Sequence, residues 1–228
     1  MADPKPVRGI IVAIDGPAGA GKSTIARQLA RHFGLLNLES GAMYRAFALK
    51  ALRSGIPLDE STSLERLAAE TVIRLEPGEE DNRVLLDGED VTGLIRNQTV
   101  TEAASQVSVF PAVRSRMVRL QQQLGASGGV VMEGRDIGTK VFPDADLKIF
   151  LDADPVVREQ RRMAQQKIKR EVAADVAAEL RQRDQRDRTR AASPLVPALD
   201  AIMIDSTSLT EDEVLARVEE LAKKKLSH

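Results

Sequence analysis

The chain has 228 residues, of which 29% are charged and 43% hydrophobic, as in an ordinary soluble globular protein. It contains no cysteine and two histidines, which excludes disulfide bonds, thiolate metal sites and a cysteine nucleophile, and argues against a multi-histidine metal centre. The net charge of −1 argues against a generic nucleic-acid binder. Because the longest apolar run, residues 10–14, is too short to cross a membrane and no apolar segment precedes it, we expect a cytoplasmic protein without a signal peptide.

The first third of the chain predicts strands that alternate with helices. Residues 8–15 form an apolar, β-branched run that stops at a Gly-Pro pair, which is typical of a buried strand entering a turn. Apolar residues at helical spacing then predict a helix over residues 20–33, closed by Gly34 as its C-cap. A short strand follows at 35–38, and Ser40 is a candidate N-cap for a helix that ends near Gly55.

The rest of the chain continues this alternation after one interruption. Residues 72–75 and 83–86 predict two strands of a hairpin-like insertion, joined through Pro77 and Gly78. Helices are predicted at 100–109, at 112–124 and from Thr210 onward, and strands at 129–132, 147–151 and 201–204. Strands that alternate with helices indicate an α/β fold with a parallel sheet.

The turn after the first strand carries a phosphate-binding motif. Residues 16–23, GPAGAGKS, match the G-x-x-x-x-G-K-[ST] pattern between a predicted strand and a predicted helix, so a chance glycine-rich turn is the weaker interpretation. Its backbone N–H groups can surround phosphate oxygens at a helix N-terminus. Lys22 is expected to bridge the β- and γ-phosphates of a nucleoside triphosphate, and the Ser23 hydroxyl to ligate Mg²⁺.

The second feature is a basic window at residues 158–190, which holds 11 Lys and Arg against 6 Asp and Glu. Such a run can be a solvated helix face, but most of its cations are arginines, whose planar donor fork suits phosphate oxygens. A kinase needs arginines that neutralise charge outside the phosphate loop and a segment that closes over the site. A GTPase needs a guanine-reading N-K-x-D motif, which is absent, so the D-x-x-G match at 90–93 is interpreted as a coincidence.

Seven segments of the chain resemble bacterial cytidylate kinases, in order and over roughly residues 9–209. They are IDGPAGAGKST, SGAMYRA, LLDGEDVTGLIRNQTV, ASQVSVFPAVR, EGRDIGTKVFPDADLKIFL, QRDQRDRTRAASPLVPALDA and IDSTSL. The resemblance implies a P-loop parallel sheet flanked by helices, with residues 1–66, 107–154 and 191–228 as the core. It also implies a monophosphate-binding insertion with a small antiparallel sheet at 67–106 and an Arg-rich helical lid at 155–190. The implied reaction is transfer of a phosphoryl group from MgATP to CMP or dCMP.

The resemblance also assigns roles to single residues. ATP phosphates are expected at Gly16, Pro17, Ala18, Gly19, Ala20, Gly21, Lys22, Ser23 and Thr24, and a Mg²⁺-bound water at Glu133. Near the acceptor phosphate the expected residues are Ser40, Tyr44, Arg45 and Arg135, and for cytosine they are Ser105, Arg114 and Asp136. Arg183 and Asp187 are expected to contact the sugar, and Arg190 the acceptor or transferring phosphate. Lys22, Arg135, Arg190 and the lid residues Arg161 and Arg162 are expected to stabilise charge during transfer.

Several alternatives remain open from the sequence alone. Tyr44 could cap the core, Ser105 could be an ordinary helix hydroxyl, and Arg114 could share a solvated helix face with Arg116 and Arg119. The chain could also phosphorylate UMP or a non-nucleotide alcohol, or act as an ATP-dependent RNA-binding switch without catalysis. For the kinase we expect ATP and CMP or dCMP as its only partners, with no nucleic acid, no membrane and a monomeric chain.

Overall fold

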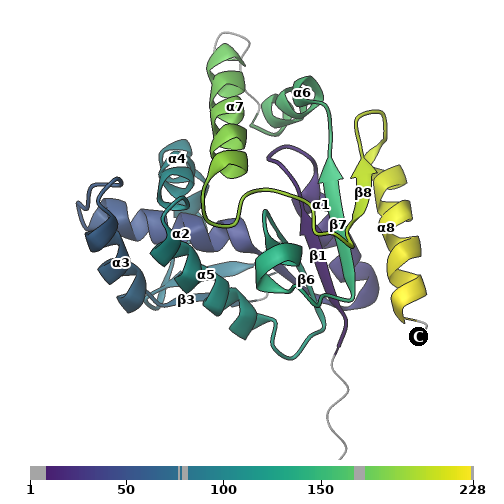
Figure 1. Ribbon diagram of the computed structural model, residues 1–228, viewed down its shortest axis with the longest axis horizontal. Helices are drawn as coiled ribbons and strands as arrows, with labels where there is room; N and C mark the ends of the chain where they lie inside the picture. Colours follow the sequence, from purple (N-terminus) through teal and green to yellow (C-terminus); the bar gives the residue numbers. More distant parts are fainter. Residues whose placement is uncertain (1–8, 77, 79–81, 167–172, 227–228) are drawn as a thin grey trace, which may run out of the picture.

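The computed structural model describes residues 9–76, 78, 82–166 and 173–226. At its centre is a five-stranded parallel sheet with helices on both faces (Figure 1). The strand order along the sheet is β2 (Leu36–Glu39), β6 (Val130–Gly134), β1 (Ile11–Asp15), β7 (Leu147–Asp152) and β8 (Ile202–Asp205). All four pairings are parallel, so the carboxyl ends of the strands meet at one edge. The predicted α/β class is confirmed, and ligands of such sheets bind at this edge.

The two faces of the sheet are covered by different helices, because successive side chains of a strand point to opposite faces. Val12 and Ile14 of β1 pack with α1 (Lys22–Phe33) and α8 (Glu211–Leu226). Ile11 and Ala13 pack on the other face, with α2 (Ser40–Arg53) and α5 (Pro111–Leu124). β1 is buried on both faces, and it places the residues that follow it at the middle of the functional edge.

The predicted insertion is a separate, antiparallel sheet. β3 (Ile73–Glu76) pairs with β4 (Arg83–Leu86), and β4 pairs with a third short strand, β5 (Glu89–Asp90), that the sequence did not predict. The hairpin is therefore confirmed, although Pro77 of its predicted connection lies outside the described residues. In the chain, α3 (Ser61–Glu70) precedes this sheet, and the 3₁₀ turn η1 (Leu94–Arg96) and α4 (Gln98–Val107) follow it.

Two helices form the predicted basic region. α6 (Pro155–Gln166) and α7 (Ala173–Thr189) stand above the functional edge of the sheet, with α7 over the side of α4 (Figure 1). Residues 167–172 of the basic window lie outside the described residues. The division of the chain into a core, an insertion at 67–106 and a lid at 155–190 stays a prediction.

Helix ends follow the expected chemistry in most places. Gly34 closes α1 in the left-handed conformation, with φ 64°. At the start of α8, Thr210 and Glu213 hydrogen-bond reciprocally, as in a capping box. Ser40 is not an N-cap, however, since α2 begins at this residue and the Ser40 hydroxyl donates to the backbone oxygen of Glu133 instead. In the part of the chain that the structure describes, no helix is both long and apolar enough to cross a membrane.

Candidate active site

The phosphate-binding motif forms a tight loop between β1 and α1. Gly16 has φ +148°, and a Cβ there would lie 2.0 Å from the backbone oxygen of Leu151 in β7. Gly19 has φ +79°, and a Cβ there would lie 2.9 Å from the backbone oxygen of Arg158 in α6. Both positions require glycine because of this conformation and this close approach. The loop is therefore held against β7 and against α6.

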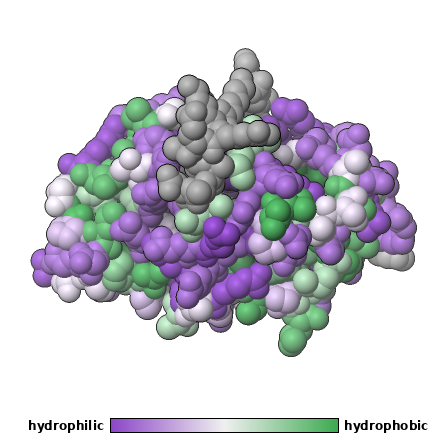
Figure 2. Space-filling view, turned by 90° about the horizontal axis from the view of Figure 1, so that it is seen from above, coloured by the Kyte–Doolittle hydropathy of each residue, from purple (hydrophilic) through white to green (hydrophobic). Residues whose placement is uncertain are grey.

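A cavity of about 450 Å³ opens at the carboxyl edge of the sheet. Seen from above, the face of the molecule around its centre is mainly hydrophilic (Figure 2). The cavity brings together most of the expected site residues: Ala18, Gly19, Gly21, Lys22, Ser23, Thr24, Ser40, Tyr44, Arg45, Ser105, Arg114, Glu133, Arg135, Asp136, Arg162, Arg183, Asp187 and Arg190. Gly16, Pro17 and Ala20 belong to the same loop but do not line the cavity.

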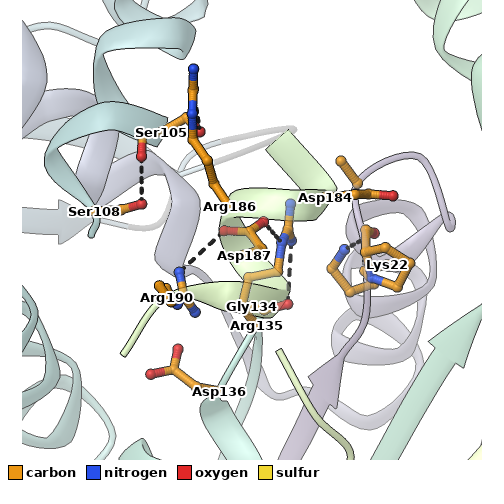
Figure 3. A network of polar contacts seen from close by, with 12 residues as sticks. Lys22, Ser105, Ser108, Gly134, Arg135, Asp136, Asp184, Arg186, Asp187 and Arg190 are labelled. Carbon is orange, nitrogen blue, oxygen red and sulfur yellow. Dashed lines mark hydrogen bonds and ion pairs between the residues drawn. The ribbon is translucent and has the colours of Figure 1, made fainter. Parts of the chain in front are cut away.

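Lys22 lies at the N-terminus of α1 and is 5% exposed. Its ammonium group donates to the backbone oxygen of Pro17 at 2.7 Å (Figure 3). Burial and the nearby Arg135 together lower the pKa of Lys22 to about 7, against the attraction of Glu133. A cation held in this way gains stability when an anion replaces part of its lost hydration.

Ser23, the residue after Lys22 in α1, contacts Glu133 of β6. The Ser23 hydroxyl donates to Glu133 Oε1 at 2.6 Å, and burial raises the pKa of the Glu133 carboxyl. Hydroxyl and carboxylate oxygens are the ligands that Mg²⁺ prefers. Among the described residues, no cluster of three or more His, Cys, Asp or Glu could hold a metal without help. The pair therefore fits a cation that takes its remaining ligands from phosphate and water.

Arginines gather around a buried aspartate next to these residues. Asp187 of α7 accepts from Arg135 at 2.8 Å and from Arg190 at 3.1 Å (Figure 3). Although burial raises the pKa of Asp187, these arginines lower it below its usual value. Burial and the nearby Arg135 together lower the pKa of Arg183 to about 10. Several positive charges thus share one carboxylate, which favours binding of a further anion.

Two arginines of the cavity, Arg45 and Arg190, have nitrogen atoms that are also suited to binding an anion. Arg45 Nε and Arg190 Nη2 are buried and have no hydrogen-bond partner among the described residues. Arg45 is held by Glu39 through its Nη2 atom at 2.5 Å, and Arg190 donates from Nε to the backbone oxygen of Ser193 at 2.7 Å. Buried donors are rarely left unpaired in proteins, so both nitrogens are suited to phosphate oxygens.

A second buried ion pair lies at the α4 and α5 side of the cavity. Arg114 of α5 donates to Asp136 at 2.5 Å, and the two residues are 3% and 4% exposed. The Tyr44 ring lies against the Arg114 guanidinium, with 5.5 Å between its centroid and Cζ. Ser105 is also buried, and its hydroxyl accepts from Arg186 of α7 at 3.3 Å. The alternative of a solvated helix face is therefore wrong for Arg114.

The structure places one expected residue elsewhere. The Arg161 guanidinium donates to the Ser206 hydroxyl at 2.8 Å and to the Ser206 backbone oxygen at 2.6 Å. Arg161 thus anchors α6 to the segment between β8 and α8, and it does not line the cavity, whereas its neighbour Arg162 does. Adjacent residues of a helix point in directions about 100° apart, so Arg161 and Arg162 can face different neighbours.

The cavity also includes residues to which the sequence assigned no role in the site. They are Arg27, Glu39, Gly41, Arg96, Thr101, Ala104, Ser108 and Gly134. Arg27 is four residues after Ser23, which places both on one side of α1, so helical spacing could have indicated it. Arg96 stands in the 3₁₀ turn η1, for which the sequence pattern held no signal.

Comparison with known proteins accords with this geometry. A family model described as cytidylate kinase matches residues 12–224. A cytidylate kinase of Pelotomaculum thermopropionicum is 50% identical over 216 residues, which cover 91% of this chain and 93% of that protein. A cytidylate kinase of Solibacter usitatus is 50% identical over 218 residues, 94% of this chain and 92% of that protein. A bifunctional pantoate ligase/cytidylate kinase of Synechococcus sp. strain JA-3-3Ab is 49% identical over 218 residues, 92% of this chain and 40% of that longer protein. This chain therefore belongs to the cytidylate kinase family.

Proposed function

We propose that the chain is a cytoplasmic enzyme that transfers the γ-phosphoryl group of ATP to CMP or dCMP. An oxygen of the acceptor phosphate attacks the γ-phosphorus, a new phosphoanhydride bond forms, and the bond to the bridging oxygen of ADP breaks. The products are ADP and CDP or dCDP. A phosphate monoester is largely a dianion near pH 7, because its second pKa is about 6, so no general base is needed. Catalysis then consists of positioning and charge stabilisation.

ATP phosphates are assigned to the loop of residues 16–24, and Lys22 is assigned to the transferring group. Its present acceptor, the backbone oxygen of Pro17, belongs to the same loop, so a short movement suffices to bring its ammonium group to a phosphate. Ser23, and Glu133 through a water, would hold the Mg²⁺ that accompanies ATP, and this ion neutralises phosphate charge when bound. Arg135, Arg162 and Arg190 line the same cavity and are assigned to the negative charge of the reacting phosphates.

The acceptor phosphate is assigned to Ser40, Arg45, Arg135 and Arg190, and the sugar to Arg183 and Asp187. Arg45 Nε and Arg190 Nη2 support this assignment, since both are buried donors without a partner among the described residues. Arg161 is not assigned to a phosphate, because its guanidinium hydrogen-bonds to the segment at residues 206–209. All assigned residues belong to one chain, so we propose that a monomer suffices and that the partners are the two nucleotides alone.

Recognition of cytosine is supported by one observation, the buried ion pair of Arg114 and Asp136 in the cavity that also contains Lys22. Cytosine presents an amino donor next to an unprotonated ring nitrogen. An ionised carboxylate can only accept and a guanidinium can only donate, so Asp136 suits the amino group and Arg114 the ring nitrogen. Uracil would turn its carbonyl toward Asp136 and its N–H toward Arg114, and both contacts would be repulsive. The Ser105 hydroxyl can either donate or accept.

A steady-state assay of ADP release tests the proposal, with MgATP and a panel of CMP, dCMP, UMP, AMP and shikimate as acceptors. We expect kcat/KM to be highest with CMP or dCMP and ADP release to be low when no acceptor is added. Higher kcat/KM with UMP or shikimate would assign the chain to another acceptor. RNA affinity that falls steeply with salt, without ADP release on any acceptor, would indicate the non-catalytic switch.

A further inference from the structure

Asp15 is a buried carboxylate to which the phosphoryl transfer assigns no role. It is the last residue of β1 and directly precedes Gly16, the first residue of the phosphate loop. The residue is 4% exposed. Its Oδ1 atom accepts the backbone N–H of Ile137 at 2.8 Å, and its Oδ2 atom accepts the backbone N–H of Gly138 at 2.7 Å. Both oxygens of one side chain therefore hold two consecutive peptide groups.

These two peptide groups open the π-helical turn η2 (Ile137–Val141), directly after Asp136. Within this turn, Lys140 and Val141 donate their N–H groups to the backbone oxygen of Asp136, at 2.9 and 3.2 Å. The first N–H groups of a helical turn have no such partner inside the turn. Ile137 is fully buried, so without a distant acceptor its N–H group would be unsatisfied. Asp15 supplies that acceptor from 122 residues away in the sequence.

The contact between Asp15 and the turn is close. A Cβ added to Gly138 would lie 3.4 Å from Asp15 Oδ2 and 3.2 Å from the Cδ atom of Lys148. The turn is thus packed on the carboxylate and leaves little room for a side chain. On the opposite side, the chain runs from Asp136 back through Arg135 and Glu133 into β6, which pairs with β1 at Asp15 and Gly134. One carboxylate therefore sits between the phosphate loop and the residues assigned to the acceptor.

We propose that Asp15 is a positioning residue for acceptor recognition, which sets the orientation of Arg135 and Asp136 relative to the phosphate loop. The inference rests on the proposed phosphorylation of CMP, since it needs Arg135 and Asp136 to contact that acceptor. Asp15 itself touches neither nucleotide in this assignment. It affects the reaction indirectly, because it fixes the orientation of the backbone that carries Arg135 and Asp136.

The ionisation of Asp15 agrees with this role. The pKa of Asp15 is raised to about 6, because burial outweighs the two backbone N–H groups that lower it; Asp136 adds to the increase and Lys22 opposes it. The carboxylate is therefore ionised at pH 7.5 to 8, where both oxygens can accept. An asparagine of the same shape can accept with one atom only, and its amino group would face a backbone N–H.

Asp15→Asn is the direct test, with Asp146→Asn as the matched control. Asp146 Oδ2 accepts the N–H of Ile11 at 2.7 Å, at the far end of the same strand, so the control also alters a carboxylate that holds a backbone N–H. We expect Asp15→Asn to raise KM for CMP about tenfold and to narrow the CMP/UMP ratio of kcat/KM. The reason is that the variant leaves one buried backbone N–H group of the turn without an acceptor. KM for ATP should change less than about threefold, and Asp146→Asn should leave all three values unchanged.

Gly138→Ala keeps the test decisive if Asp15→Asn does not fold. Its added methyl group would lie 3.2 Å from Lys148 Cδ and touch Asp15 Oδ2 at 3.4 Å, so it crowds the turn beside the carboxylate without changing any charge. We expect the same selective rise in KM for CMP. If either folded variant raises KM for both substrates equally, or lowers only the melting temperature, Asp15 is structural and the inference is overturned. The wild-type assay separates this from failure of the proposed function, since a wild-type chain that does not phosphorylate CMP removes the function itself.

Discussion

Ser23 and Glu133 are joined by a hydrogen bond of 2.6 Å, although 110 residues separate them in the sequence. Ser23 lies in the first turn of α1, and Glu133 lies near the end of β6, opposite Ile14 of β1. The contact arises because the carboxyl ends of adjacent parallel strands, and the helix that follows the first of them, meet at one edge of the sheet. Two oxygen ligands suited to Mg²⁺ are therefore brought together beside the phosphate loop.

The first prediction concerns Glu133 as one of these two expected Mg²⁺ ligands. Glu133→Gln removes the negative charge but keeps the shape, and we expect the Mg²⁺ concentration for half-maximal activity to rise about 10- to 100-fold. A Mg²⁺ titration at saturating ATP and CMP measures it, with the exposed Glu102→Gln as the control. An unchanged requirement in the folded variant would mean that Glu133 does not contribute to the metal site.

The second prediction concerns Lys22. Lys22→Ala should leave the fold intact and lower kcat at least about 100-fold, because charge stabilisation in the transition state is lost. Circular dichroism checks the fold, and Lys140→Ala, which removes an exposed lysine, serves as the control. Near-normal turnover in a folded Lys22→Ala protein would remove the assignment of the phosphate loop.

The third prediction follows from the pKa of Lys22, which burial and then Arg135 lower to about 7. Bound phosphate favours the charged lysine, so the complex holds the proton more tightly than the free protein does. Above about pH 7, ATP binding should therefore take up a proton, and the affinity should fall as the pH rises. Calorimetric titrations at one pH, in two buffers of different ionisation enthalpy, measure this uptake.

Lys22→Arg provides the control for that experiment. Arginine keeps its proton throughout this pH range, so proton uptake on ATP binding should disappear in the variant. A wild-type protein whose binding enthalpy does not depend on the buffer would show that Lys22 is already fully charged before ATP binds.

The fourth prediction concerns α6 and α7. α7 contacts α4 through the bond from Arg186 to Ser105 and through a bond of 3.1 Å from Gln98 to Glu179. If these helices close over bound phosphates, amide hydrogen exchange in residues 155–166 and 173–189 should slow when a bisubstrate analogue binds. Exchange in the part of α8 that packs with α1 on one face of the sheet should not change. Equal protection of α6 and α7 with and without the analogue would instead indicate a static basic face.

Much of this site could be predicted because local patterns determine it. The GPAGAGKS motif lies between a strand and a helix, and the structure places Lys22 and Ser23 at the start of that helix as expected. Glu133, Arg135 and Asp136 follow a recognisable buried strand, so their place at the sheet edge follows from the parallel topology. The resemblance to cytidylate kinases supplied the remaining acceptor residues, most of which line one cavity.

The features that could not be predicted depend on contacts between distant segments. Arg161 and Arg162 are adjacent arginines of one helix, and only the position of Ser206 decides that Arg161 faces away from the cavity. The Ser40 hydroxyl has an acceptor in Glu133 that outcompetes a capping role. Asp15 looks like an ordinary end of a strand in the sequence, and its two bonds to Ile137 and Gly138 exist only in the folded chain.

The fifth prediction concerns base choice. Asp136→Ala and Arg114→Met should each weaken CMP binding far more than ATP binding, and should narrow the CMP/UMP ratio of kcat/KM at least about tenfold. Each change leaves its partner charged and buried, so thermal unfolding must be measured alongside. Arg119→Met, on the exposed side of α5, and the exposed Asp144→Ala are the matched controls.

The most direct measurement is a competition in which the wild-type protein receives equal concentrations of CMP and UMP with MgATP, and CDP and UDP are separated by chromatography. The ratio of the initial rates equals the ratio of kcat/KM for the two acceptors, so it reports base recognition alone. We predict that CDP greatly exceeds UDP in the wild-type protein and that the excess shrinks in both Asp136→Ala and Arg114→Met. Equal amounts of CDP and UDP from the wild-type protein, or an unchanged ratio in both folded variants, would contradict recognition of cytosine by this buried pair.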